Sequence, residues 1–293
     1  MSDFAKITVV GVTGLQDRAF RTGLAIEQTA RLLPASSALL ISPERPAGLA
    51  AGIRHQSGCT PGYAAYQRFM LFDLADCIDT EFALVVQHDG WALSAENWST
   101  EFLQYDYIGA PVHLGQVKMP DGTSQYLRHF LWVEQLQKPD VTVNFVMNGG
   151  FSLRTQKLMR APRELSLQFP PPLNENDENL EDVWLSTTVR TDLERHGIRF
   201  APLHMACQFS IEHAAVFHQK FPMKSIFGHH SRMRRVEELM ERGGVLSYAA
   251  SFEDCKKLFG EIAVLAMLFD QGWMVRWPDG RLSNRIIATA RGR

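Results

Sequence analysis

Short apolar runs alternate with segments of helical periodicity at the start of the chain, and this alternation restricts the fold more than any other feature of the sequence. The runs at 7–12, 38–42 and 82–87 are rich in aliphatic and β-branched residues, as buried strands are. The segments 17–33 and 65–78 space apolar residues three or four apart, which is the period of a helix with one buried face. Strands that alternate with helices in this way form a mostly parallel sheet with helices on both faces. The sequence therefore predicts an α/β fold.

The helical periodicity also predicts which side chains face the core. The predicted core residues share one face of each helix: Phe20, Leu24, Ile26, Ala30, Leu33, Phe69, Phe72, Ala75 and Ile78.

The rest of the chain has a less regular pattern. It predicts strands at 106–112, 143–154, 198–202 and 204–212, a loop or lid at 113–142, and a helix at 183–197 that ends at Gly197. We expect residues 1–235 to form one domain. Residues 236–293 should form a mainly helical C-terminal extension, in which the apolar run 262–269 is a buried helix too short to cross a bilayer.

Charge and cysteine usage exclude several classes of protein. The formal net charge is −2 and basic residues form no long block, so no nucleic-acid partner is expected. The four cysteines lie far apart, without a CxxC pair, which favours a reducing compartment. We find no secretory signal and no membrane span, and expect a cytoplasmic protein, with attachment at the periphery of the inner membrane left open.

The run at 82–87 ends in Gln87, His88, Asp89 and Gly90, which is unusual for a buried strand. Ligands of open α/β sheets bind at the carboxyl ends of the strands. In an extended segment Gln87 and Asp89 would share a face, with His88 opposite, and an amide oxygen and a carboxylate suit a hard divalent cation. Gly90 would let the backbone turn beneath the ligand. The competing interpretation is a plain Asp-Gly turn.

Three further motifs are candidates for function. Asn148-Gly149-Gly150 interrupts a strand, which indicates close approach of a ligand or of another backbone segment, or else a β-bulge or a simple turn. Glu181-Asp182 begins a predicted helix, where acids also simply complement the helix dipole. The sequence FGHH at 227–230 predicts a loop with two histidines that are each candidate ligands.

The ordered set QHDGW, YDYIGAP, NGGFSLR, LEDVW and FGHH resembles a family of uncharacterised bacterial and fungal proteins with the GT-A fold of glycosyltransferases. The resemblance covers residues 5–232, and its specificity lies in the order of the motifs. It implies a Rossmann-like domain with a mixed, mostly parallel central sheet. Enzymes of this fold bind a nucleotide-sugar, and a metal held by an Asp-x-Asp motif at the end of a central strand.

The resemblance also implies roles for individual residues. Asp89 is then the main acidic metal ligand, Gln87 replaces the first acid of the motif, and His230 completes the metal shell, with His229 as the alternate. Asp182 is the expected catalytic base and Glu181 the fallback. The remaining residues fall on the donor and acceptor sides: Val12, Thr13, Gly14, Ser42, Arg68, Gln87 and His88 for the donor, and Asn148, Gly149 and Gly150 for the acceptor.

The function expected from the resemblance is transfer of a sugar from a nucleotide-diphosphate sugar, with a UDP-sugar favoured, to a hydroxyl group. The cofactor would be Mn²⁺ or Mg²⁺, the stereochemistry inverting, and the acceptor a glycan, a lipid-linked compound or a protein. Such a reaction belongs to polysaccharide biosynthesis, for example of bacterial surface glycans. Two alternatives stay open: a nucleotide-sugar-binding module without catalysis, and a metal-dependent hydrolase that uses Asp89 and the histidines.

Overall fold

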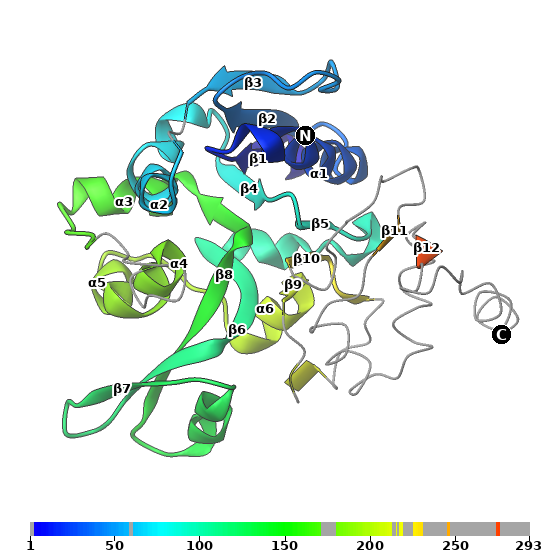
Figure 1. Ribbon diagram of the computed structural model, residues 1–293. Helices are drawn as coiled ribbons and strands as arrows, with labels where there is room; N and C mark the ends of the chain where they lie inside the picture. The colour runs from blue at the N-terminus through cyan, green and yellow to red at the C-terminus, as the bar shows by residue number, and fades with distance from the viewer. Residues whose placement is uncertain are drawn as a thin grey trace, which may run out of the picture.

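A seven-stranded mixed sheet forms the centre of the protein (Figure 1). The computed structural model describes residues 3–58, 61–170, 180–212, 215, 217–218 and 225–230, together with the two short strands Val245–Leu246 and Met274–Val275. The strand order is β3-β2-β1-β4-β8-β6-β7. The strands are β1 Ile7–Val12, β2 Ser37–Ser42, β3 Arg54–Ser57, β4 Phe82–Val86, β6 Tyr107–Lys118, β7 Ser124–Leu127 and β8 Thr142–Thr155.

The first four strands are parallel, and β8 runs antiparallel between β4 and β6. This arrangement confirms the predicted α/β fold with a mixed central sheet. Because β1 and β4 are parallel neighbours, the segments that follow them, at Thr13 and Gln87, emerge at the same edge of the sheet.

Helices cover both faces of the sheet, as Figure 1 shows. The helix α1 lies on one face together with α6, and α2 to α5 lie on the other. Alternating strand residues serve the two layers, since Val9 packs in the core beneath α1 and Val10 in the core beneath α2. The helices are α1 Gln16–Leu32, α2 Tyr63–Phe72, α3 Gln156–Glu164, α4 Glu181–Val183, α5 Arg190–Arg195 and α6 Leu203–Phe209.

The predicted buried face of the first helix was wrong at Phe20, whose surface is 44% exposed. The buried face of α1 consists mainly of small residues: Ala19, Thr22, Gly23, Ala25, Ile26 and Thr29. A side chain at Gly11 of β1 would overlap Thr22 Cγ2, so the helix lies almost against the strand. Because α1 lies so close to β1, its buried face has room mainly for small side chains, whereas the periodicity had predicted large ones there.

The predicted helix at 65–78 is α2 followed by the 3-10 turn Leu74–Cys77. Its buried residues include Gln67, Met70 and Leu71, while Phe69 and Phe72 are only partly buried.

The segment 113–142 is ordered structure, so the predicted loop or lid was wrong. Strand β6 continues to Lys118 and pairs with β7, and the 3-10 helix Leu131–Gln137 follows. Trp132 from this helix is fully buried and stacks on Phe145 of β8 at 5.5 Å. A few buried aromatic residues order the segment, which explains why it shows no periodic pattern.

Two of the predicted later strands were also wrong. Residues 203–209 form α6, which buries Met205, Ala206 and Phe209 on one face, and only Ser210–Ile211 (β9) is a strand. Residues 198–202 contribute a single bridge, between Phe200 and Tyr107. The helix expected at 183–197 is α4, a π-helical turn at Trp184–Thr188, and α5, and Gly197 ends it with a φ of 76°.

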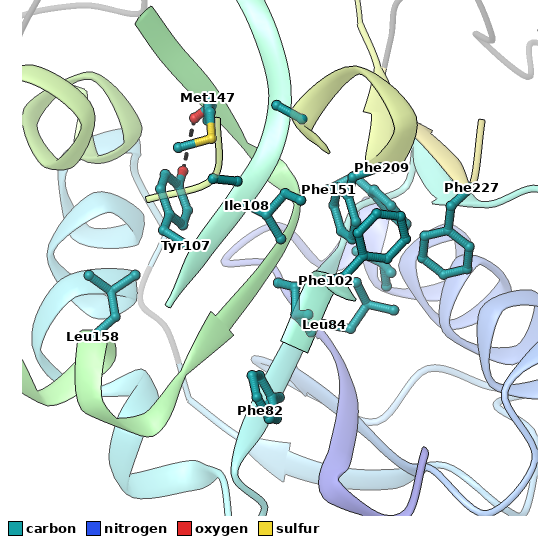
Figure 2. Close-up of a cluster of buried hydrophobic side chains, with 14 of the residues drawn as sticks. Phe82, Leu84, Phe102, Tyr107, Ile108, Met147, Phe151, Leu158, Phe209 and Phe227 are labelled. Atoms are coloured by element: carbon teal, nitrogen blue, oxygen red, sulfur yellow. Dashed lines mark hydrogen bonds between the residues drawn. The ribbon is translucent and has the colours of Figure 1, made fainter. Parts of the chain in front are cut away.

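The sequence FGHH forms a strand where a loop was predicted. Gly228–His230 (β10) pairs with Gly90–Ala92 (β5) and with β9 in a small three-stranded sheet. Figure 2 shows the rings of Phe102, Phe151, Phe209 and Phe227 gathered in the core next to this sheet. A side chain at Gly228 would overlap the ring of Phe151, so the glycine lets β10 lie directly on the aromatic core.

The part of the chain that the structure describes contains no helix that is long and apolar enough to cross a membrane. Cys77 and Cys207 are buried free thiols. Apart from the two short strands, the predicted helical extension at 236–293 lies outside the described residues, as do Cys59 and Cys255.

Candidate functional site

A tight turn at residues 87–90 joins β4 to β5. The amide and carbonyl groups of Gln87 and Gly90 bond each other at 3.1 and 3.2 Å, which places His88 and Asp89 at the two corners. Residues 87–90 therefore form the Asp-Gly turn that the sequence indicates. The expected alternation of side chains, with His88 opposite to Asp89, was wrong, because His88 Nδ1 lies 3.5 Å from Asp89 Oδ1.

His230 reaches this turn because β10 pairs with β5 in a register that sets His230 opposite Gly90. Its Nε2 atom lies 3.1 Å from Gln87 Oε1 and 3.4 Å from Asp89 Oδ1. A side chain at Gly90 would meet the backbone oxygen of His229 at 2.9 Å, so Gly90 is needed for close strand packing. His229 is fully buried and packs edge-on against Trp91, so His230 is the histidine of this pair that lies beside Asp89.

A second carboxylate faces the other nitrogen of His230. Glu212 Oε1 lies 3.6 Å from His230 Nδ1. Burial would lower the pKa of His230, but Asp89 and Glu212 raise it to about 10. Burial would likewise raise the pKa of Asp89, yet His230 holds it well below its usual range. With no metal bound, the two carboxylates therefore favour an imidazolium, and a cation held by Nε2 would have to replace the proton on that atom.

The donor set Asp89, Gln87 and His230 fits a divalent cation in its chemistry. It offers a carboxylate, an amide oxygen and an imidazole, and the buried Asp89 Oδ1 faces the ring nitrogens of His88 and His230 at 3.5 and 3.4 Å. Within the described ranges, no three side chains of the His, Cys, Asp and Glu types surround a single point as metal ligands do. Any metal at this position would therefore depend on Gln87 or on ligand oxygens.

A pocket of about 410 Å³ opens next to the turn, at the carboxyl ends of β1 and β4. It lies at the start of α1 and of α2, and the residues before these helices, Leu15 and Gly62, provide no side-chain cap. The N-terminus of a helix carries a partial positive charge, which favours an anion. The lining residues are Val12, Thr13, Gly14, Leu15, Arg18, Thr22, Gly62, Tyr63, Tyr66, Gln87 and His88.

Five of the seven residues predicted on the donor side line this pocket: Val12, Thr13, Gly14, Gln87 and His88. The other two do not. Ser42 is fully buried, where it donates to the backbone oxygen of Glu44 and contacts His55. Arg68 lies on the surface over the ring of Phe72.

The pocket residues that the sequence analysis missed include Arg18, Tyr63 and Tyr66. They lie in or close to the first turns of α1 and α2. The signal that could have found them is their position at helix starts that face the carboxyl edge of the sheet.

Asn148, Gly149 and Gly150 form a bulge in β8. Between the pairs Gly109–Ser152 and Pro111–Met147 the strand β8 contains more residues than β6, so the bulge interpretation is confirmed. Asn148 Oδ1 accepts the amide hydrogens of Gly150 and Phe151 and holds the bulge in shape.

The bulge brings the two carboxylates of the Glu181-Asp182 motif to β8. Asp182 Oδ2 accepts the amide hydrogen of Gly149 at 3.1 Å, and Asp182 Oδ1 accepts that of Val183. Burial, and next the charge of Glu181, raise the pKa of Asp182 to about 7. Because its side chain is only partly buried, Asp182 is a carboxylate that can exchange protons near neutral pH.

Glu181 has a different environment. Its carboxylate forms a bidentate ion pair with Arg154, at 2.9 and 3.2 Å, and both side chains are buried. Arg154 also donates to the backbone oxygen of Gly149. Glu181 is thus occupied in holding the start of α4 against β8.

Residues around His230 (Gln87, Asp89 and Glu212, here called the His230 cluster) are connected to Asp182 in two places. Each connection runs through a pair of adjacent residues. On β8, Gly149 binds Asp182, and a side chain at Gly150 would overlap His230 Nε2. On α2, Tyr66 accepts a hydrogen bond from Gln87 Nε2, and Gln67 Oε1 accepts the amide hydrogen of Glu181. Gln87, His230 and Asp182 are therefore connected through neighbouring residues of β8 and α2.

Gly150→Ala should cost about 1–3 kcal/mol of unfolding free energy, because the added methyl group overlaps His230. Urea denaturation would measure the cost. Gly52→Ala is the matched control, since nothing lies within 4 Å of the methyl group that it adds. In a His230→Ala background, Gly150→Ala should cost little, and an equal cost in both backgrounds would show that His230 is not what requires the glycine.

The fold and the pocket define an α/β protein with a pocket at the carboxyl edge of its sheet. Residues 54–230 match a family described as "Protein of unknown function (DUF5672)", a span of more than half of the chain, so the chain belongs to this family. The match runs from β3 to β10 and contains Asp89, Asp182 and His230.

No curated protein matches the chain. Among solved structures, it is similar to the crystal structure of mannose-1-phosphate geranyltransferase from Thermus thermophilus. The sequence identity is 16% and the TM-score 0.29, over 61% of this chain and 67% of that chain. A TM-score this low carries no argument about function.

Proposed function

We propose that the protein is a glycosyltransferase that moves a sugar from a nucleotide-diphosphate sugar to an acceptor hydroxyl. The observation that carries the proposal is the pocket between the N-termini of α1 and α2, bordered by Gln87 and His88. Its volume suits a small ligand, and its two uncapped helix ends suit phosphate groups. The ordered motifs that resemble GT-A enzymes support the same function.

The donor would lie with its nucleoside along the end of β1 and its diphosphate towards Arg18 and the turn at Gln87. Arg18 and the helix ends supply positive charge to the side of the pocket where a departing diphosphate gains negative charge. Asp89, Gln87 and His230 would hold Mn²⁺ or Mg²⁺, which supplies Lewis-acid stabilisation of the leaving group when bound.

The acceptor would bind on the side of Asp182. The pKa of Asp182, about 7, matches that of a general base that removes a proton from a hydroxyl group at neutral pH. Glu181, the fallback, is less suited, because a carboxylate held in a buried ion pair with Arg154 cannot take a proton without breaking that pair. A base positioned for direct displacement by the acceptor favours inversion at the anomeric carbon.

The proposal is tested by measuring the affinity of the protein for UDP, GDP and CMP, with and without Mn²⁺, and nucleotide release from the corresponding sugar donors. We expect one nucleoside diphosphate to bind and to raise the melting temperature, as a ligand of the folded state does. Turnover with an acceptor establishes the transferase. Donor binding without turnover would instead identify the nucleotide-sugar-binding module, and absence of nucleotide binding would overturn the proposal.

Asp89→Asn should remove the part of nucleotide affinity that depends on Mn²⁺, because an amide is a much weaker ligand of a hard cation than a carboxylate. Affinity measured in EDTA should stay the same in the variant and the parent. Asp121→Asn, on an exposed loop beside β7, is the matched control for removal of a charge. If Asp89→Asn responds to Mn²⁺ as the parent does, the metal is held elsewhere.

A further inference from the structure

The hydroxyl group of Tyr66 has a proton that the rest of the described site leaves without an acceptor. Tyr66 lies on α2 and lines the pocket. The Gln87 side chain donates from Nε2 to the Tyr66 oxygen at 2.7 Å, while its own oxygen faces His230. In this hydrogen bond the phenol oxygen is the acceptor, so its O–H group remains available to donate.

The described residues supply no second hydrogen bond to this hydroxyl group, although the ring is partly buried. Because Tyr66 lines the pocket, the acceptor of this proton must come from the pocket, either as water or as an oxygen of a bound ligand. The pocket is the open space beside it, and the charges around that space suit an anion: Arg18 lines the pocket, and both helix N-termini face it.

We propose that Tyr66 is a ligand-binding residue whose hydroxyl group donates a hydrogen bond to a phosphate oxygen in the pocket. The inference rests on the proposed function for the identity of the ligand, a nucleoside diphosphate. The anion-binding role of Tyr66 itself requires only a phosphate group. By accepting from Gln87 and donating to phosphate, Tyr66 links the turn at residues 87–90 to the bound ligand.

Tyr66→Phe removes the hydroxyl group and keeps the ring. Titrations in EDTA with UDP, uridine and inorganic pyrophosphate then separate the phosphate contact from the rest of the pocket and from any metal bound through Gln87. The variant should bind UDP and pyrophosphate roughly tenfold more weakly than the parent, which is the usual effect of losing a hydrogen bond to a charged group. Uridine affinity should remain within about twofold of the parent.

Tyr126→Phe is the matched control, because the Tyr126 hydroxyl contacts Thr187 and does not line the pocket. A Gln87→Leu background completes the design. If Tyr66 acts on phosphate directly, Tyr66→Phe still weakens pyrophosphate binding when the amide of Gln87 is gone.

Three results would overturn the inference. They are unchanged UDP and pyrophosphate affinity in Tyr66→Phe, equal losses for UDP and uridine, and an effect that disappears in the Gln87→Leu background. Pyrophosphate binding that depends on Tyr66, in a protein that binds no nucleotide, would support the inference and overturn the proposed function. A parent protein that binds neither would overturn both.

Discussion

Asp182→Asn should lower the rate of sugar transfer by about 10²- to 10⁴-fold, which is the usual contribution of a positioned general base. The amide cannot accept the proton of the acceptor hydroxyl. Nucleotide affinity should change little, because Asp182 bonds the backbone at Gly149 and Val183 and does not line the donor pocket. Turnover, nucleotide affinity and melting temperature measured on the same variant would check each part of this expectation.

The pH dependence gives a second measurement of the same residue. Activity of the parent should rise with pH and level off above the Asp182 pKa of about 7, since the base must be ionised. Stability should change in the opposite direction. An acid whose pKa is raised by folding stabilises the protein below its unfolded pKa, near 3.9, and loses that contribution as the pH rises through 7. Relative to the parent, Asp182→Asn should therefore gain in melting temperature between pH 5 and pH 8.

Retained turnover in Asp182→Asn would assign the base to another residue. An unfolded variant would show that Asp182 is mainly a structural cap of the bulge in β8. Asp192→Asn is a matched control on an exposed helix, where the carboxylate pairs with Arg195 and its removal should affect neither activity nor the pH profile.

Arg154→Met should cost about 3–5 kcal/mol of unfolding free energy, because it leaves the carboxylate of Glu181 buried without a partner. Both side chains of this pair are almost fully buried, at 1% and 4% exposure, so water cannot replace the lost contact. Urea denaturation at neutral pH, compared with the parent, would measure the cost. Arg163→Met, which breaks an exposed pair with Asp76, should cost much less, because water and salt screen that pair.

The double variant Arg154→Met with Glu181→Gln separates the charge from the packing. Removing both charges should recover much of the stability lost in Arg154→Met, since the remaining groups are neutral. If the double variant is as unstable as the sum of the single variants, the ion pair is not what makes Arg154 important. A variant in which α4 is misplaced should also lose sugar transfer, because α4 begins at Glu181 and carries Asp182.

Local patterns predicted β1, β2 and β4 well, because each of these strands contains a continuous apolar run. They missed β3, which is a polar strand at the edge of the sheet. They failed where burial depends on partners far away in the chain. The segment at 113–142 is ordered by Trp132 against Phe145, and Gly228 is required by the ring of Phe151. Neither requirement leaves a periodic signal.

The sequence motifs grouped Gln87 with His230, and the two side chains do lie together in the structure, although they are 143 positions apart in the chain. They could not show which histidine of the pair faces the site. That choice depends on the register of β10 against β5, which buries His229 against Trp91. Tyr66 and Arg18 were missed for a similar reason, because a residue in the first turn of a helix has no local mark of what it faces.

The glycines of the β8 bulge have a consequence for how related sequences are compared. A methyl group at Gly149 would overlap Glu181, and one at Gly150 would overlap His230, so each glycine is demanded by a side chain of the protein itself. Substitution at these positions is therefore coupled to positions 181 and 230. In a relative with alanine at 150, the residue at 230 should be smaller than histidine, and such a relative will have lost the cluster at the turn.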